Sequence, residues 1–168
     1  SMSGLEAMHW SASYPKEVEA IIGLDMSLPQ AYDKYRSNRL LYKTLQFAAN
    51  LGLSRWLYSP DKEIRSLSNG SLNPKEKSIY KALFYRRPLS NSIIKEAEEV
   101  KSNAKLVKQD KVPAIPYLLF VSNGQGTGFA RKDWQDMSKD FAKDHKNVQL
   151  KSFDVPHYIH SYIPDELV

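Results

Sequence analysis

The sequence of 168 residues contains no cysteine, which excludes disulfide bonds, a thiol nucleophile and thiolate metal ligands. It also has no run that approaches the roughly 20 apolar residues of a membrane-spanning helix. Its first residues do not have the pattern of a signal peptide. The absence of cysteine fits a reducing compartment but also many exported bacterial-type proteins, so it does not decide the location, and a cytoplasmic one is the favoured expectation. An export signal or membrane anchor in a preceding segment is the alternative.

Charge of one sign does not dominate, because the sequence has 24 Lys and Arg and 19 Asp and Glu, for a net charge of +5. Such a charge is compatible with binding to nucleic acid or to an anionic membrane surface. However, lysines alternate with acids through Lys95–Lys111 and Arg131–Lys146, as on solvated helix faces. We therefore expect no nucleic-acid partner, and a basic protein that binds anionic surfaces is the third of three functional hypotheses.

What is present is the composition of a folded domain, with 42% hydrophobic and 11% aromatic residues. Nearly continuous apolar runs within Glu17–Asp25 and Pro116–Ser122 predict two strands buried on both faces. A third strand is expected at Val148–Val155. Apolar residues at helical spacing predict helices elsewhere. The expected helices are Ser3–Tyr14, Ala31–Leu51, one opened by the capping-box sequence Asn73-Pro74-Lys75-Glu76, Ser92–Lys108, Arg131–His145 and one beginning at Pro164.

The order of these elements predicts an α/β fold with a parallel sheet and helices on both of its faces. Residues 1–28 and 111–168 are expected to form the core, with the last two strands in the second segment. The intervening residues 29–110 have no strand pattern, and about 80 residues are too many for an ordinary crossover. We expect this segment to form a helical cap, or lid, over one end of the sheet.

Three polar groups follow the predicted strands, at the edge where parallel sheets collect ligands and reactive groups. They are Asp25, the turn Asn123–Gln125 and His157. A histidine directly after a buried strand suits catalysis better than core packing, with a surface-turn histidine as the plain alternative. The other histidines are interpreted as surface residues without a role: His9, His145 and His160.

The first residues, Ser1-Met2-Ser3-Gly4, precede a predicted helix directly. This is typical of the second half of a nucleophile elbow, the sharp strand-to-helix turn that exposes a serine hydroxyl. A serine left by removal of a tag is the alternative origin of Ser1. The chain ends with Val155-Pro156-His157-Tyr158 and then Ile163-Pro164-Asp165-Glu166. In these motifs, and in Gly23-Leu24-Asp25, the whole chain resembles the C-terminal portion of an α/β-hydrolase, although Pro156 stands where that family usually has glycine.

The resemblance implies a serine hydrolase. Ser1 would attack an acyl carbonyl, His157 would accept the serine proton, and the backbone N–H of Met2 would be one oxyanion-hole donor. The family most often places the acid of the triad after the penultimate strand, where this sequence has no carboxylate. Some members place it one strand earlier, at the position of Asp25, where it would orient the imidazole and stabilise its cation. The alternative is that Asp25 caps the strand end or the next helix.

The implied substrate is a small, partly apolar ester, amide or similar acyl compound, and no cofactor and no metal are expected. The second oxyanion-hole donor and further strands would belong to a missing N-terminal half of the fold, in the same or a separate chain. The second functional hypothesis is a non-catalytic relative that serves as a binding protein, or an inactive fragment.

Overall fold

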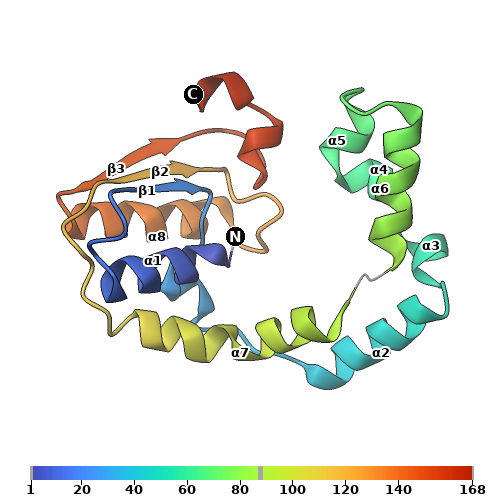
Figure 1. Ribbon diagram of the computed structural model, residues 1–168, viewed down its shortest axis with the longest axis horizontal. Coiled ribbons are helices and arrows are strands. Elements are labelled where there is room, and N and C mark those ends of the chain that lie inside the picture. Colours follow the sequence, from blue (N-terminus) through green and yellow to red (C-terminus); the bar gives the residue numbers. More distant parts are fainter. Residues whose placement is uncertain (1, 87–88, 168) are drawn as a thin grey trace. The chain divides into compact units, whose positions relative to one another are not determined.

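The computed structural model describes residues 2–86 and 89–167. The chain forms two compact units. Unit 1 consists of Ser1–Tyr35 and Val100–Val168 and contains the sheet, and unit 2 consists of Arg36–Glu99 and is helical (Figure 1). None of the described helices is long and apolar enough to cross a membrane.

The sheet of unit 1 is parallel, as predicted, and its three strands have the order β1-β2-β3. The strands are β1 (Ile21–Leu24), β2 (Tyr117–Val121) and β3 (Val148–Ser152). Strand β1 is shorter than its apolar run. The amide of Glu17 donates to the carbonyl of Tyr14 in a turn and therefore does not join the ladder with β2.

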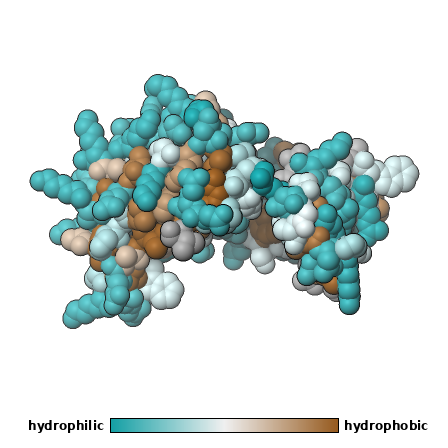
Figure 2. All heavy atoms as spheres, turned by 90° about the horizontal axis from the view of Figure 1, so that it is seen from above, coloured by the Kyte–Doolittle hydropathy of each residue, from teal (hydrophilic) through white to brown (hydrophobic). Residues whose placement is uncertain are grey.

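The expectation that the first strand is buried on both faces is wrong. Ile21 and Gly23 are buried, whereas Ile22 and Leu24 are 66% and 41% exposed. Alternating residues of a strand point to opposite faces, so only one face of β1 is packed. Figure 2 shows apolar surface among the polar side chains on the upper side of unit 1, away from the helices under the sheet in Figure 1.

The packed face lies against α1 (Ser3–Ser13) and α8 (Arg131–Asp144), both of which are drawn below the sheet in Figure 1. These helices and the last turns of α7 (Asn91–Val107) confirm the helical periodicity of their segments. Gly4 lets α1 approach the chain after β1 closely, because a Cβ there would lie 2.6 Å from the carbonyl oxygen of Ser27. The buried apolar side chains between these elements form one core, which consists of Leu5, Met8, Ile21, Met26, Leu28, Ala31, Val100, Ala104, Val107, Tyr117, Leu119, Val121, Trp134 and Phe141.

Unit 2, Arg36–Glu99, covers fewer residues than the insert that was expected over residues 29–110. Ala31 at one end, and Val100 and Ala104 at the other, pack into the core of unit 1. The single helix expected over Ala31–Leu51 is wrong. Residues Pro29–Tyr32 form a short 3-10 helix (η1), and α2 (Arg39–Asn50) begins anew because the side chain of Asn38 caps it by accepting from the Leu41 amide at 3.0 Å.

The predicted capping box opens α6 (Pro74–Arg86). The Asn73 amide donates to Glu76 Oε2 at 2.8 Å, and the Glu76 amide donates to Asn73 Oδ1 at 3.0 Å. Between α2 and α6 lie three helices of one turn each: α3 (Ser54–Leu57), α4 (Pro60–Glu63) and α5 (Arg65–Ser68). The helix expected from Pro164 is a 3-10 turn, η3 (Pro164–Glu166), preceded by η2 (Ile159–Ser161).

Candidate functional site

Asp25 is the first residue after β1 and has an unusual backbone. Its φ of 51° lies in the left-handed region, which aspartate enters more readily than most residues but at some cost. Its amide still donates to the carbonyl of Phe120, at 2.8 Å, so β1 stays attached to β2 up to this point. The side chain is 1% exposed. A buried carboxylate is stable only where donors satisfy both of its oxygens.

Donors from three residues of the described part of the chain reach this carboxylate. Oδ1 accepts from the Ser122 amide at 2.7 Å and from Nε1 of Trp134 at 2.9 Å, and Oδ2 lies 2.5 Å from Nδ1 of His157. Burial raises the pKa of the Asp25 carboxyl. The hydrogen bonds from His157, Ser122 and Trp134 lower this pKa, and together they outweigh the effect of burial. The pKa of Asp25 therefore lies below its ordinary value, and the group is a carboxylate at neutral pH.

An ionised Asp25 determines the tautomer of His157. A carboxylate can only accept, so Nδ1 carries the proton of a neutral imidazole and Nε2 keeps a lone pair. Among the described residues, Nε2 has no hydrogen-bond partner. The side chain is 16% exposed. The imidazole is therefore oriented at one nitrogen and open to proton transfer at the other.

The loop after β2 also positions His157, through its backbone. The His157 amide donates to the carbonyl of Gln125 at 2.9 Å. Gly126 has φ +90°, and a Cβ there would lie 3.6 Å from the Cβ of His157. The side chain of Asn123, also in this loop, donates to Asp154 Oδ1 at 2.9 Å. Of the polar groups after β1 and β2, the one that contacts the imidazole is thus Asp25.

Ser1 lies outside the described residues. Met2 is the N-cap residue of α1, and its carbonyl accepts from the Leu5 amide at 2.9 Å. The first amides of a helix have no partner within the helix and favour negative charge. Figure 1 shows the start of α1 on the same side of unit 1 as the carboxyl ends of the strands and the loop after β2.

Two contacts of the site were not anticipated from the sequence, those of Trp134 and Ser122 with Asp25. The helical spacing of Trp134 and Phe141 within Arg131–His145 is typical of core residues, and the Trp134 ring is part of the core. A signal was available, because a buried indole N–H usually has a hydrogen-bond acceptor. Periodicity cannot say which acceptor that is, since Trp134 and Asp25 are 109 residues apart.

The remaining histidines form no comparable arrangement. His9 lies on α1, with Nδ1 2.7 Å from Asp110 Oδ2, but its side chain is half-exposed. His145 Nδ1 is 2.9 Å from the carbonyl of Phe141, within its own helical turn. No cluster of side chains suited to holding a metal ion occurs in residues 2–86 and 89–167.

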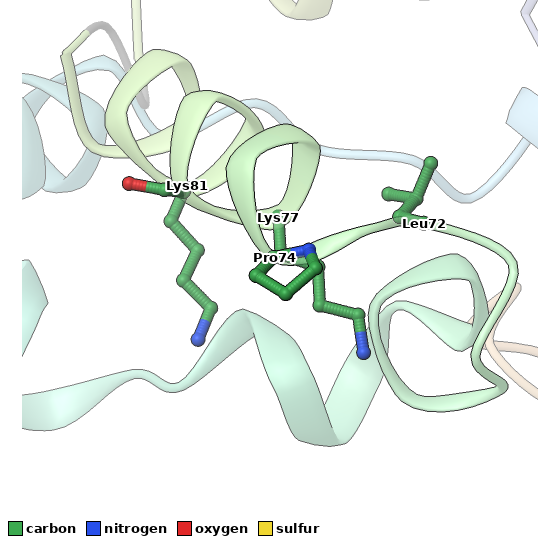
Figure 3. A pocket seen from close by; sticks show the side chains of 5 residues that line it. Leu72, Pro74, Lys77 and Lys81 are labelled. Atoms are coloured by element: carbon green, nitrogen blue, oxygen red, sulfur yellow. The ribbon is translucent and has the colours of Figure 1, made fainter.

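A hollow of about 410 Å³ lies elsewhere, in unit 2 (Figure 3). Its lining residues are Leu72, Pro74, Lys77, Ser78 and Lys81. Figure 3 shows the Lys77 and Lys81 side chains extending from α6 to the same side. Lys81 Nζ is already paired with Asp61, at 2.7 Å. The hollow contains no group that resembles the Asp25–His157 pair.

Comparison with known proteins gives little functional information. No protein-family model matches the chain. The chain is 26% identical over 174 aligned positions to the uncharacterized protein YbdG of Bacillus subtilis (strain 168). The alignment covers 99% of this chain and 53% of YbdG, so the chain spans about half the length of that relative.

Proposed function

We propose that this chain is part of an α/β-hydrolase-type serine hydrolase that cleaves an ester, amide or similar acyl bond of a small, partly apolar substrate. The observation that carries the proposal is the buried Asp25 carboxylate at Nδ1 of His157, with Nε2 unpartnered among the described residues. The pair lies at the carboxyl ends of parallel strands, where reactive groups gather in such sheets. The α/β-hydrolase-like motifs of the sequence support the other two roles in the proposal, Ser1 as the nucleophile and the Met2 amide as an oxyanion-hole donor.

In the proposed reaction His157 acts as the general base. Nε2 accepts the proton of the Ser1 hydroxyl while the serine oxygen attacks the acyl carbon, and the resulting imidazolium is stabilised by Asp25. The imidazolium then gives its proton to the leaving group, which departs as the acyl-enzyme forms. Water repeats the sequence and releases the acid. The Met2 amide, at the start of α1, would hold the negative oxygen of each tetrahedral intermediate.

We further propose that the helical insert acts as a cap that provides apolar surface to the substrate. On α2, Leu40, Leu41 and Phe47 are exposed. The polar side chains of the same helix have partners instead: Lys43 Nζ donates to Asn91 Oδ1 at 2.9 Å, and Gln46 Nε2 donates to the carbonyl of Leu89 at 2.5 Å. An apolar face left open on a helix is a common mark of a binding surface.

The proposal extends to the edge and the open face of the sheet. Strand β1 is an edge strand that pairs with β2, and we propose that strands from an N-terminal half of the fold, in the same or a separate chain, pair with its other side. A helix of that half on the open face would cover Ile22 and Leu24, which are exposed, and a loop among its strands would provide the second oxyanion-hole donor.

Labelling with a fluorophosphonate probe tests the function in the natural gene product. Covalent labelling at Ser1 that is lost in His157→Ala, together with hydrolysis of p-nitrophenyl esters that is lost in the same variant, supports it. His160→Ala is the matched control, because His160 is an exposed histidine three residues away. Ester hydrolysis that survives His157→Ala, or binding of acyl compounds without turnover, would instead indicate a non-catalytic binding protein.

A further inference from the structure

Trp134 contacts both members of the Asp25–His157 pair. It lies on the second turn of α8 and is 5% exposed. Its indole N–H donates to Asp25 Oδ1 at 2.9 Å. Its ring meets the imidazole of His157 edge to face, with centroids 6.1 Å apart and planes at 88°. One side chain therefore touches the acid through a hydrogen bond and the base through its ring.

We propose that Trp134 is a positioning residue, which holds the Asp25 carboxylate and the plane of the His157 imidazole in the orientation required for proton transfer. The catalytic role of Trp134 rests on the proposed function. Its contact with the Asp25 carboxylate can be tested without measuring ester hydrolysis.

The carboxylate needs such a support because rotation about its last bond is soft. The χ2 torsion of aspartate has broad, roughly two-fold minima, so the backbone alone does not decide which oxygen faces which neighbour. Trp134 and the Ser122 amide both donate to Oδ1, which leaves Oδ2 directed at Nδ1 of His157. Without the indole donor, Oδ1 would keep the hydrogen bond from the Ser122 amide but would lose the hydrogen bond from α8.

The imidazole is supported in a second way. The positive edge of one aromatic ring favours the face of another, which fixes their relative planes. Phe129 packs against Trp134 as well, with centroids 5.5 Å apart. The indole thus packs on Phe129 as well as on the imidazole, and these contacts restrict the planes of both rings.

The loop after β2 is shaped to admit this indole. Gly124 has φ +83°, and a Cβ there would lie 3.1 Å from the Cβ of Trp134 and 3.5 Å from its Cγ. Both the backbone conformation and the space require glycine. The neighbouring helical residue Gln135 donates to the carbonyl of Ser122 at 3.1 Å. The start of α8 is therefore tied to the residue after β2 directly next to Trp134.

The decisive variants remove the indole donor and keep an aromatic ring. Trp134→Phe does so with a natural but smaller ring, and β-(3-benzothienyl)alanine at position 134 does so with a bicyclic ring of nearly the same size. Phe141→Leu is the matched control, because Phe141 is a buried aromatic residue of the same helix that packs on Tyr117 instead. The two readouts are the titration midpoint of the Asp25 carboxyl carbon by NMR and the kcat and KM of ester hydrolysis.

We expect both donor-free variants to raise the titration midpoint of Asp25, because a hydrogen bond that favours the carboxylate is lost. We expect kcat to fall about tenfold or more with little change in KM, since a bond to a charged group is lost at the acid and substrate contacts are not. Phe141→Leu should change neither quantity.

An unchanged Asp25 midpoint in a folded benzothienylalanine variant would overturn the proposal, and so would a midpoint that shifts equally in Phe141→Leu. A wild-type protein that hydrolyses no acyl substrate would defeat the proposed function. The Asp25 midpoint would still decide whether Trp134 holds the carboxylate, so the two failures are distinguishable.

Discussion

Asp25 Oδ2 lies 2.5 Å from Nδ1 of His157, although 132 residues separate the two in the sequence. Each follows a strand of the same parallel sheet, β1 and β3, and the strand between them contributes the Ser122 amide to the same carboxylate. The pair is therefore a product of sheet topology. Its consequences for reactivity and stability can be measured separately.

Asp25→Asn should leave the fold intact and reduce esterase activity by roughly 10⁴-fold if His157 is the general base. An amide at this position can present its NH₂ group to Nδ1, which favours the wrong imidazole tautomer and cannot stabilise the cation. The measurement is kcat for a p-nitrophenyl ester. Asn123→Ala is the control, because Asn123 bonds to Asp154 and not to the imidazole. Equal effects of the two substitutions would contradict the assignment of Asp25 as the acid.

The lowered pKa of Asp25 predicts a stability that depends on pH. A carboxyl group whose folded pKa is depressed stabilises the fold above the unfolded pKa of about 3.9, and loses that contribution as the pH falls through the folded pKa. The urea midpoint of the wild type should exceed that of Asp25→Asn at neutral pH, and the difference should shrink below about pH 4. Asp136 and Asp154 also have lowered pKa values but are present in both proteins. A difference that stays constant down to pH 2 would refute the prediction.

Gly4→Ala should destabilise unit 1 by about 1–3 kcal/mol, in spite of the better helix propensity of alanine. The added Cβ would lie 2.6 Å from a backbone oxygen, that of Ser27, and backbone cannot move aside as a flexible side chain can. Thermal or urea unfolding measures the change. Glu6→Ala, at an exposed position of the same helix, is the control. If Gly4→Ala is as stable as the control, α1 does not pack against the chain after β1 as described.

Asn73→Ala should destabilise the start of α6 by about 1 kcal/mol, because it removes the Asn73 side-chain oxygen that accepts from the Glu76 amide in the reciprocal capping box. Hydrogen exchange of the first-turn amides should become faster, most clearly at Glu76, whose amide loses its acceptor. Lys75→Ala is a suitable comparison, since Lys75 is exposed in the same turn. Unchanged protection at Glu76 would mean that the box does not form in solution.

Phe47→Ser tests the cap. Phe47 is an exposed apolar residue of α2. If that surface receives the apolar part of the substrate, KM should rise several-fold for long acyl chains and little for acetate esters, since each buried CH₂ contributes about 0.8 kcal/mol. Thr44→Ser, a small change at an exposed polar position of the same helix, is the control. A KM that does not depend on chain length in either protein would argue against a substrate role for α2.

Many of the helices and strands were predictable because their signals are local. The apolar runs of β1 and β2, the periodicity of α8 and the capping box at Asn73 each lie within a few residues and depend on backbone geometry alone. The parallel direction of the strands follows from their alternation with helices. Even the proximity of Asp25 and His157 was foreseeable, because the residues that follow the parallel strands of one sheet gather at the same edge of it.

Three features could only be decided by the tertiary structure. An apolar run cannot show how many of its faces are covered, and β1 proved to be packed on one face. Helical pattern does not show where one compact unit ends, and the last turns of α7 belong to the core of unit 1. The partner of the Trp134 indole depends on how α8 crosses the sheet, which is set by close packing of side chains from distant segments. The sequence by itself therefore determined the elements and the edge at which polar groups gather, whereas packing between those elements decided which donors hold the Asp25 carboxylate.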